Sequence, residues 1–482
     1  MTENIQYDLI TALPELTVLT MAILILLLEL FIKPSQRIFL YGLAQFTLFA
    51  AAFFLLRTMT SSVGYAFNYL FIDDALSDVL KLFTLLGASL MFVYTREYLQ
   101  LRGMFKGEYY VLALLSILGM MVMISGQSLL TIYIGLELLS LSLYALVAMD
   151  RDNAQATEAA MKYFVLGALA SGLLLYGMSM VYGVASSLNL ADIANALLGG
   201  TQYHAVLILG LVFIVAGLAF KLGAVPFQMW VPDVYQGSPT AITILIGSIP
   251  KFAAFAMVVR LLGQGLQSLS PDWQGMLLLM AVLSILVGNV TAIAQTNIKR
   301  MLAYSTISHI GFLLFGLMSA NLNGVQSALF YIAAYVLMTL AGFGMVLLLS
   351  RKGFESDQLN DLKGLNQRSP WYAFLMMLVM LSMAGVPGTI GFIAKFTVLQ
   401  AALGAGFLWP VVFAALMACV GAFYYLRVIW YMYFEAADSD VSIQAPKDMR
   451  LILSLNALAL LVLGLFPQQV LNLCAYAVAV SL

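Results

Sequence analysis

Runs of about 20 apolar residues follow one another along almost the whole of this 482-residue chain. A helix needs about 20 residues to cross the hydrocarbon core of a bilayer, and in lipid a helix satisfies its own backbone hydrogen bonds. The composition agrees, because 63% of the residues are apolar and only 9% are charged. We therefore predict an all-α polytopic membrane protein with no soluble domain.

Charged or turn residues separate the apolar runs and predict about fourteen transmembrane helices. These lie near residues 12–32, 38–57, 73–94, 108–125, 128–149, 158–183, 205–225, 238–262, 273–294, 299–318, 324–350, 371–400, 405–434 and 450–474. Most of the 22 Lys and Arg residues fall in loops on one side of this arrangement, whereas the opposite loops carry only Arg57 and Arg260. Because positively charged loops stay in the cytoplasm, both termini are predicted to lie on the outer face.

Two of the predicted helices are interrupted by glycine and proline. One break follows Lys221, at residues 223–226, and the other precedes Lys395, at residues 385–388. Such breaks free backbone groups at membrane depth, which is typical of a transporter site. The breaks lie five spans apart, and an odd separation turns the second copy upside down. We expect three N-terminal helices in 1–107, inverted five-helix repeats in 108–262 and 263–434, and a last helix in 435–482.

Single ionisable residues stand inside several of the apolar runs. They are Glu137, Lys221, Lys251 and Lys395, and burying each costs at least roughly 2.5–3.5 kcal/mol on insertion scales. Their retention indicates ion or proton movement. A structural alternative exists for each, since Glu137 could be a neutral carboxyl in a helix contact and the lysines could be structural. His309 is a further candidate, either as a relay group or as a hydrogen-bonded interhelical histidine.

Two other charged residues within the helices favour structural roles. Lys81 stands three residues from Asp78 and is expected to pair with it, and Arg427 is near enough to its helix end to reach the interface.

Redox centres and nucleotide sites are not indicated. The two cysteines, Cys419 and Cys474, are too few for an iron–sulfur or zinc site, and no glycine-rich loop follows a strand. A haem held by His204 and His309 is the remaining possibility, weakened by the position of His204 near a segment end. We expect no cofactor in this chain.

Four motifs give the chain a family resemblance. Residues 220–240 (FKLGAVPFQMWVPDVYQGSPT) and 299–311 (KRMLAYSTISHIG) closely resemble signatures of the antiporter-like membrane subunits of respiratory complex I, a proton-translocating NADH-quinone oxidoreductase. Residues 135–146 (GLELLSLSLYAL) and 391–396 (GFIAKF) are similar to those of the N type within that family, the counterpart of mitochondrial subunit 2. Gln228 departs from the pattern, because a histidine is common there.

The resemblance implies fourteen helices in a bacterial inner membrane and proton translocation driven by quinone reduction in other subunits. NADH, flavin, iron–sulfur clusters and quinone would belong to those partners, and this chain would contact neighbouring antiporter-like subunits and lipids, with no nucleic acid. By motif position, Glu137 and Lys221 would be a switchable ion pair, Lys251 the link at the midplane, His309 a relay group and Lys395 the terminal group.

Three other functions remain open from the sequence. A subunit of a multi-subunit sodium/proton antiporter would share the same helical core. An autonomous solute permease is disfavoured because no pocket rich in varied polar groups is evident. A non-pumping scaffold subunit would tolerate neutralisation of Lys221, Lys251 and Lys395.

Overall fold

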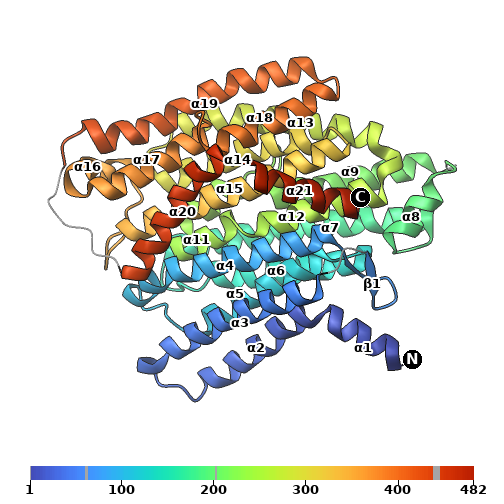
Figure 1. Ribbon diagram of the computed structural model, residues 1–482, viewed down its shortest axis with the longest axis horizontal. Coiled ribbons are helices and arrows are strands. Elements are labelled where there is room, and N and C mark those ends of the chain that lie inside the picture. The colour runs from blue at the N-terminus through green and yellow to red at the C-terminus, as the bar shows by residue number, and fades with distance from the viewer. Residues whose placement is uncertain (1, 60–62, 201–202, 438–445) are drawn as a thin grey trace.

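The computed structural model describes residues 2–59, 63–200, 203–437 and 446–482. Helices run side by side across the molecule, from the N-terminal pair α2 and α3 at one edge to α18 and α19 at the opposite edge (Figure 1). The marked ends of the chain both lie toward the right of that view, where β1 and α8 also lie, whereas α16 lies at the left.

The described part of the N-terminal segment contains four α-helices, one short 3-10 helix labelled η1, and a β-hairpin. The elements are α1 (Thr2–Thr11), α2 (Leu13–Glu29), η1 (Pro34–Gln36), α3 (Ile38–Thr58), β1 (Gly64–Ala66), β2 (Phe71–Asp73) and α4 (Ala75–Leu101). The two strands pair antiparallel, with Tyr65 opposite Ile72. Asp74 then begins α4, because its carboxylate accepts a hydrogen bond from the Ser77 N–H while the Ser77 hydroxyl accepts from the Asp74 N–H.

The first predicted repeat contains eight helices after α4, several of them short. They are α5 (Gly107–Ile124), α6 (Leu129–Val147), α7 (Ala154–Ala185), α8 (Leu190–Leu197), α9 (His204–Leu222), α10 (Trp230–Gly237), α11 (Thr240–Gly247) and α12 (Pro250–Val258). A π-helical turn, η2 (Val259–Gly265), extends α12.

The second predicted repeat and the C-terminal segment complete the chain. Their elements are η3 (Gln267–Leu269), α13 (Ser270–Ile293), α14 (Ile298–Leu317), α15 (Leu322–Leu349), η4 (Leu359–Leu362), α16 (Leu365–Arg368), α17 (Pro370–Ala384), α18 (Ile390–Gly404), α19 (Leu408–Phe434), α20 (Lys447–Leu465) and α21 (Gln468–Ser481).

The helical, membrane-spanning architecture is confirmed, and every predicted range contains helix. Among the described residues, 11 helices are long and apolar enough to cross a bilayer, or 12 if the bent pair at the N-terminus counts as one span. The count of fourteen therefore stays a prediction. Both predicted breaks are confirmed, since α9 ends at Leu222 and α17 ends at Ala384. Two further interruptions, before Pro250 and before Gln468, were missed.

Each predicted repeat opens with a pair of helices in close backbone contact. A Cβ on Gly119 of α5 would lie 2.5 Å from the Leu139 backbone nitrogen of α6, and a Cβ on Gly288 of α13 would lie 2.6 Å from the Ser308 backbone nitrogen of α14. Only glycine permits this approach. The two predicted repeats share this close glycine contact, and their boundaries stay a prediction.

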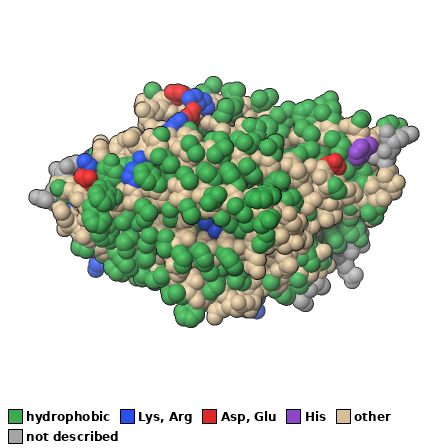
Figure 2. Space-filling model, turned by 90° about the horizontal axis from the view of Figure 1, so that it is seen from above, with side chains coloured by type: hydrophobic (Ala, Val, Ile, Leu, Met, Phe, Trp, Pro, Cys, Tyr) green, Lys and Arg blue, Asp and Glu red, His purple; other side chains and the backbone are tan. Residues whose placement is uncertain are grey.

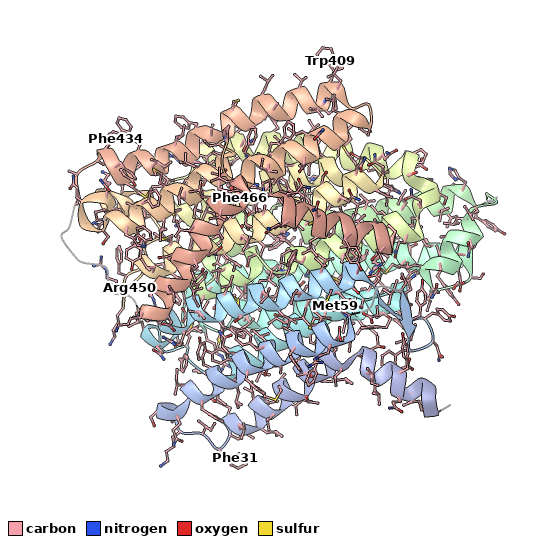
Figure 3. All side chains as sticks on the ribbon, in the orientation of Figure 1. Phe31, Met59, Trp409, Phe434, Arg450 and Phe466 are labelled. Atoms are coloured by element: carbon pink, nitrogen blue, oxygen red, sulfur yellow. The ribbon has the colours of Figure 1, made fainter. Side chains whose placement is uncertain are left out.

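The interior of the molecule is formed by two stretches in particular. Residues 240–265 are buried throughout the apolar part of their length, and α15 is almost as deeply enclosed. The surface of the helical bundle, by contrast, is largely apolar (Figure 2). Large side chains project from it, among them Phe31 (83% exposed), Trp409 (78%) and Phe434 (71%), as Figure 3 shows. Such a surface suits lipid or neighbouring subunits rather than water.

Two structural expectations from the sequence have different outcomes. Lys81 forms its ion pair with Glu15 of α2, at 2.7 Å, so the expected pairing with Asp78 was wrong. The partner lies far away in the chain, and it comes near because α2 and α4 both pack on α3 and α5. Arg427 has the structural role expected of it, because its guanidinium donates to the carbonyl oxygens of Ile293 and Gln295, both at 2.7 Å.

Candidate functional site

Glu137 and Lys221 face a shared polar cluster between α6, α7 and α9. The Lys221 ammonium donates to the Ser140 hydroxyl at 2.9 Å. The Ser171 hydroxyl of α7 donates to the Glu137 carboxylate and lies 3.1 Å from the Tyr133 hydroxyl oxygen. Among the described residues, no direct contact joins Glu137 to Lys221, and the switchable ion pair that the family resemblance implies stays a prediction. Each charge instead bonds to a serine hydroxyl, Lys221 to Ser140 and Glu137 to Ser171.

The breaks after α9 and α17 have the same backbone geometry. Gly223 and Gly385 adopt φ values of +84° and +86°, in the left-handed region that favours glycine. At the first break the N–H of Ala224 donates to the Ala219 carbonyl at 2.8 Å, and at the second the N–H of Val386 donates to the Leu381 carbonyl at 3.0 Å. Each helix thus ends sharply and exposes its last carbonyl groups.

A lysine ammonium occupies each of these exposed helix ends. Lys251 of α12 donates to the Leu222 carbonyl at 2.9 Å. Lys395 of α18 donates to the carbonyls of Met383 and Ala384 at 2.9 and 2.8 Å. The carboxyl end of a helix carries partial negative charge, which favours a cation there. The prediction that freed backbone groups would need a polar partner is confirmed, and the partners are two of the predicted site residues.

Aromatic rings cover both ammonium groups. The Lys251 nitrogen lies 5.7 Å from the centre of the Trp230 ring, and the Lys395 nitrogen lies 5.1 Å from the centre of the Phe312 ring. At these distances the rings supply weak cation–π attraction to the ammonium groups. Lys251 is buried, whereas Lys395, Lys221 and Glu137 are only partly covered by this chain. Lipid or another subunit would complete their surroundings.

His309 lies in a buried cluster of tyrosines. Its Nδ1 is 2.6 Å from the Tyr331 hydroxyl and its Nε2 is 3.2 Å from the Tyr425 hydroxyl. Tyr425 also bonds to the Ser305 hydroxyl. A neutral imidazole donates from one nitrogen and accepts at the other, so the ring joins two hydroxyl groups. Sequence reasoning missed these tyrosines, although Tyr331 and Tyr335 stand four residues apart and therefore share one face of α15.

The predicted site residues do not form one contact cluster. Lys251 lies within electrostatic range of Lys221, and His309 lies within electrostatic range of Lys395. They are distributed in two halves, each around one broken helix. Among the described residues, no group of three or more His, Cys, Asp and Glu side chains is arranged to hold a metal ion.

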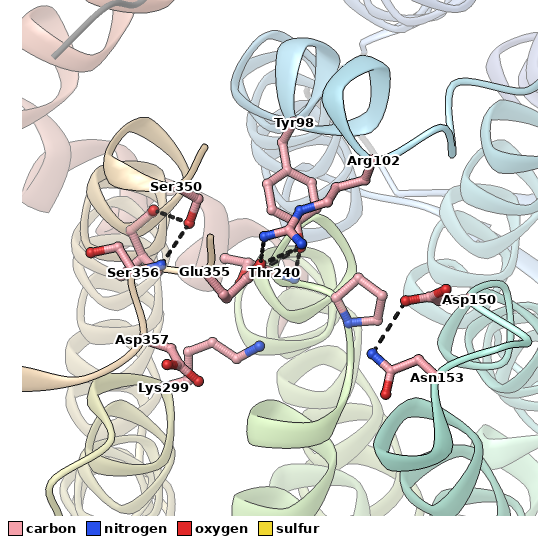
Figure 4. Close-up of polar contacts among 12 residues, drawn as sticks. Tyr98, Arg102, Asp150, Asn153, Thr240, Lys299, Ser350, Glu355, Ser356 and Asp357 are labelled. Carbon is pink, nitrogen blue, oxygen red and sulfur yellow. Dashed lines mark hydrogen bonds and ion pairs between the residues drawn. The ribbon is translucent and has the colours of Figure 1, made fainter. Parts of the chain in front are cut away.

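A second polar cluster, also missed from the sequence, lies where the two predicted repeats meet (Figure 4). Glu355 accepts hydrogen bonds from Tyr98, Arg102 and Thr240, the first residue of α11. Lys299 of α14, only 3% exposed, donates to the Ser238 carbonyl at 2.7 Å. The segment after α15 therefore ties the α10–α11 junction to α4. No local pattern signals these contacts, because the partners come from distant segments.

Residues 125–421 match the family described as NADH:quinone oxidoreductase/Mrp antiporter, transmembrane. The chain belongs to this family. Among its relatives, a protein of Methylovorus glucosotrophus called NADH-quinone oxidoreductase subunit N is 65% identical, with 99% of each chain covered. One of the same name from Thiobacillus denitrificans is 57% identical, with 98% of this chain and 97% of that protein covered.

Solved structures of two different membrane complexes share the fold of this chain. A chain of respiratory complex I from Thermus thermophilus with bound aureothin is 32% identical, with a TM-score of 0.82 and 96% of this chain and 99% of that chain covered. A chain of the Mrp complex from Dietzia is 21% identical, with a TM-score of 0.82 and coverage of 99% and 97%. At that identity, the second likeness shows the fold alone.

Proposed function

We propose that the chain is a proton-translocating membrane-arm subunit of NADH-quinone oxidoreductase, of the N type. Its similar relatives carry that name over nearly their whole length. The sodium/proton antiporter alternative is supported only by a shared fold. NADH oxidation and quinone reduction would occur in partner subunits of a bacterial inner-membrane complex, with both termini of this chain on the outer side.

The observation that carries the proposal is the placement of two lysines on the carbonyl ends of two broken helices. An ammonium on a helix end is stabilised there, and a neutral amine keeps one of its hydrogen bonds to the same carbonyl. Each lysine can therefore gain or lose a proton without leaving its place. A scaffold would need neither the broken helix nor the exchangeable group.

Protonation or deprotonation of one lysine would change the proton affinity of the next lysine. Lys221 and Lys251 lie within electrostatic range, and two like charges repel each other more strongly in a protein interior than in water. Protonation of one therefore opposes protonation of the other. Glu137 also lies within electrostatic range of Lys221 and would act on it through its field. His309 and its tyrosines would carry the effect to Lys395.

Neutralising the first pair tests this function. Glu137→Gln and Lys221→Ala should each lower proton translocation per NADH oxidised, and the double variant should lose less than the product of the two effects, since each residue acts through the other's field. The measurement is dye quenching in inverted membrane vesicles, with the amount of assembled complex determined in parallel. Full pumping by Lys221→Ala in an assembled complex would show that the chain is a scaffold.

A further inference from the structure

The buried stretch 240–265 is interrupted immediately before Lys251. Pro250 has no N–H, and the N–H of Lys251 donates to the Ser248 carbonyl at 3.1 Å, one residue short of the α-helical partner, Gly247. Within this described stretch, the Gly247 carbonyl therefore receives no N–H from the next turn. A buried carbonyl without a donor is costly, so another group must serve it.

The hydroxyl group of Tyr335, in α15, donates a hydrogen bond to the Gly247 carbonyl. Its hydroxyl oxygen lies 3.1 Å from the Gly247 carbonyl oxygen and 2.9 Å from the Thr306 hydroxyl oxygen of α14. The Thr306 hydroxyl itself donates to the Leu302 carbonyl at 2.9 Å. While that bond holds, Thr306 can only accept from Tyr335. The single phenolic proton thus has an acceptor in each predicted repeat, the Gly247 carbonyl in the first and the Thr306 hydroxyl in the second.

Both acceptors adjoin predicted relay residues. Gly247 stands four residues before Lys251, and Thr306 stands three residues before His309 on the same helix. The Tyr335 ring also packs on His309, with ring centres 5.4 Å apart, and Tyr335 is 2% exposed. Among the described contacts, Tyr335 therefore joins the break beside Lys251 to the helix that carries His309.

We propose that Tyr335 is a positioning residue that couples the two halves of the relay. When its hydroxyl donates to Gly247, the break keeps Lys251 on the end of α9. When it donates to Thr306, the carbonyl loses its partner and the break is free to shift, which moves the Lys251 ammonium. Reorientation of one hydroxyl thus biases a two-state element shared by both repeats, and no covalent bond changes. This inference rests on the proposed function.

Removal of the hydroxyl tests the coupling. Tyr335→Phe keeps the ring but removes the switch, and Thr306→Val keeps the shape but removes one acceptor. Each should lower protons translocated per NADH oxidised by roughly two- to tenfold, the scale of one buried hydrogen bond, in a complex assembled to the normal amount. The double variant should be no worse than the poorer single one, because both changes disable one device.

Two further variants make the result interpretable. Tyr94→Phe is the matched control, because Tyr94 is also a fully buried tyrosine. Its hydroxyl bonds to Asn456 and to the Ile452 carbonyl, and neither of these is a predicted relay residue. This variant should pump normally. Lys251→Ala reports on the proposed function itself.

The outcomes separate the two proposals. Normal pumping by Tyr335→Phe with impaired pumping by Lys251→Ala would overturn the coupling role and leave the function intact. Normal pumping by both would overturn the function and the inference together. Additive losses from Tyr335→Phe and Thr306→Val would show that the two hydroxyls act separately. If Tyr335→Phe does not assemble, normal pumping by Thr306→Val, which leaves the ring in place, would overturn the inference.

Discussion

At the scale of single residues, the most important polar contact at the first broken helix joins Lys221 to the hydroxyl group of a serine, Ser140. The Ser140 hydroxyl accepts a hydrogen bond from the Lys221 ammonium and donates one to the Leu136 carbonyl. Ser140 stands three residues after Glu137, about one turn further along the same helix. A hydrogen bond to a charged group is worth about 1.5–3 kcal/mol, enough to decide where the ammonium rests.

Ser140→Ala is therefore expected to impair pumping by roughly tenfold, the effect of losing about 1.4 kcal/mol from a bond to a charged group. Ser142→Ala is the matched control, since Ser142 lies on the same helix, is equally buried at 5% exposure, and bonds only to the Leu138 carbonyl of its own helix among the contacts described. Proton translocation in vesicles distinguishes the two. Equal effects of both substitutions would contradict a role for Ser140 in holding Lys221.

At the scale of the helix, the breaks and the lysines form one unit. Glycine at Gly223 and Gly385 ends the helix, and an ammonium from another segment then occupies the exposed carbonyl groups. At the second break the glycine is also required for space. A Cβ on Gly385 would lie 3.0 Å from Cδ of Lys395 and 3.3 Å from its ammonium nitrogen.

The pair Gly385→Ala and Gly388→Ala separates backbone strain from this contact. Both residues have left-handed φ values, +86° and +92°, where alanine costs roughly 1–2 kcal/mol. A Cβ on Gly388 would meet nothing within 4 Å. We expect similar losses of thermal stability, measured by unfolding of the solubilised complex, but a larger loss of pumping for Gly385→Ala, because only that substitution displaces Lys395. Equal pumping by the two variants would argue against a defined position for Lys395.

At the scale of the whole molecule, the apolar surface and the side-by-side helices suit a chain that crosses a membrane many times (Figures 1 and 2). The orientation of the chain in that membrane rests on the distribution of Lys and Arg among the loops. The loop after α15 carries Arg351, Lys352, Lys363 and Arg368, which favours the cytoplasm. The two ends of α15 therefore belong on opposite sides.

Single cysteines at the two ends of α15 test that orientation. In a background with Cys419 and Cys474 replaced by alanine, Asn323→Cys should react with a membrane-impermeant maleimide in spheroplasts, and Lys352→Cys only in inverted vesicles. Both positions are exposed in the structure, so accessibility does not differ between them before the membrane is considered. The reverse labelling pattern would place both termini of the chain in the cytoplasm.

Local chemistry accounts for what could be predicted. The repeated apolar runs determine an all-α membrane protein, and Gly-Pro sequences at 223–226 and 385–388 determine the two predicted breaks, because both properties depend on neighbours along the chain. Isolated charges at Glu137, Lys221, Lys251 and Lys395 could be identified as candidates for the same reason. The break before Pro250 was missed because the surrounding run reads as one uninterrupted apolar span.

Only the tertiary structure decided which partner each buried group has. Lys251 bonds to the carbonyl of a residue 29 positions away, and Tyr335 bonds to one 88 positions away. Helix packing likewise sets Ser140 against the Lys221 ammonium, while the switchable pairing of Glu137 with Lys221 stays a prediction. Sequence determines that a buried polar group needs a partner, because desolvation is costly for any such group. The identity of that partner depends on which helices pack together, and that is a property of the whole fold.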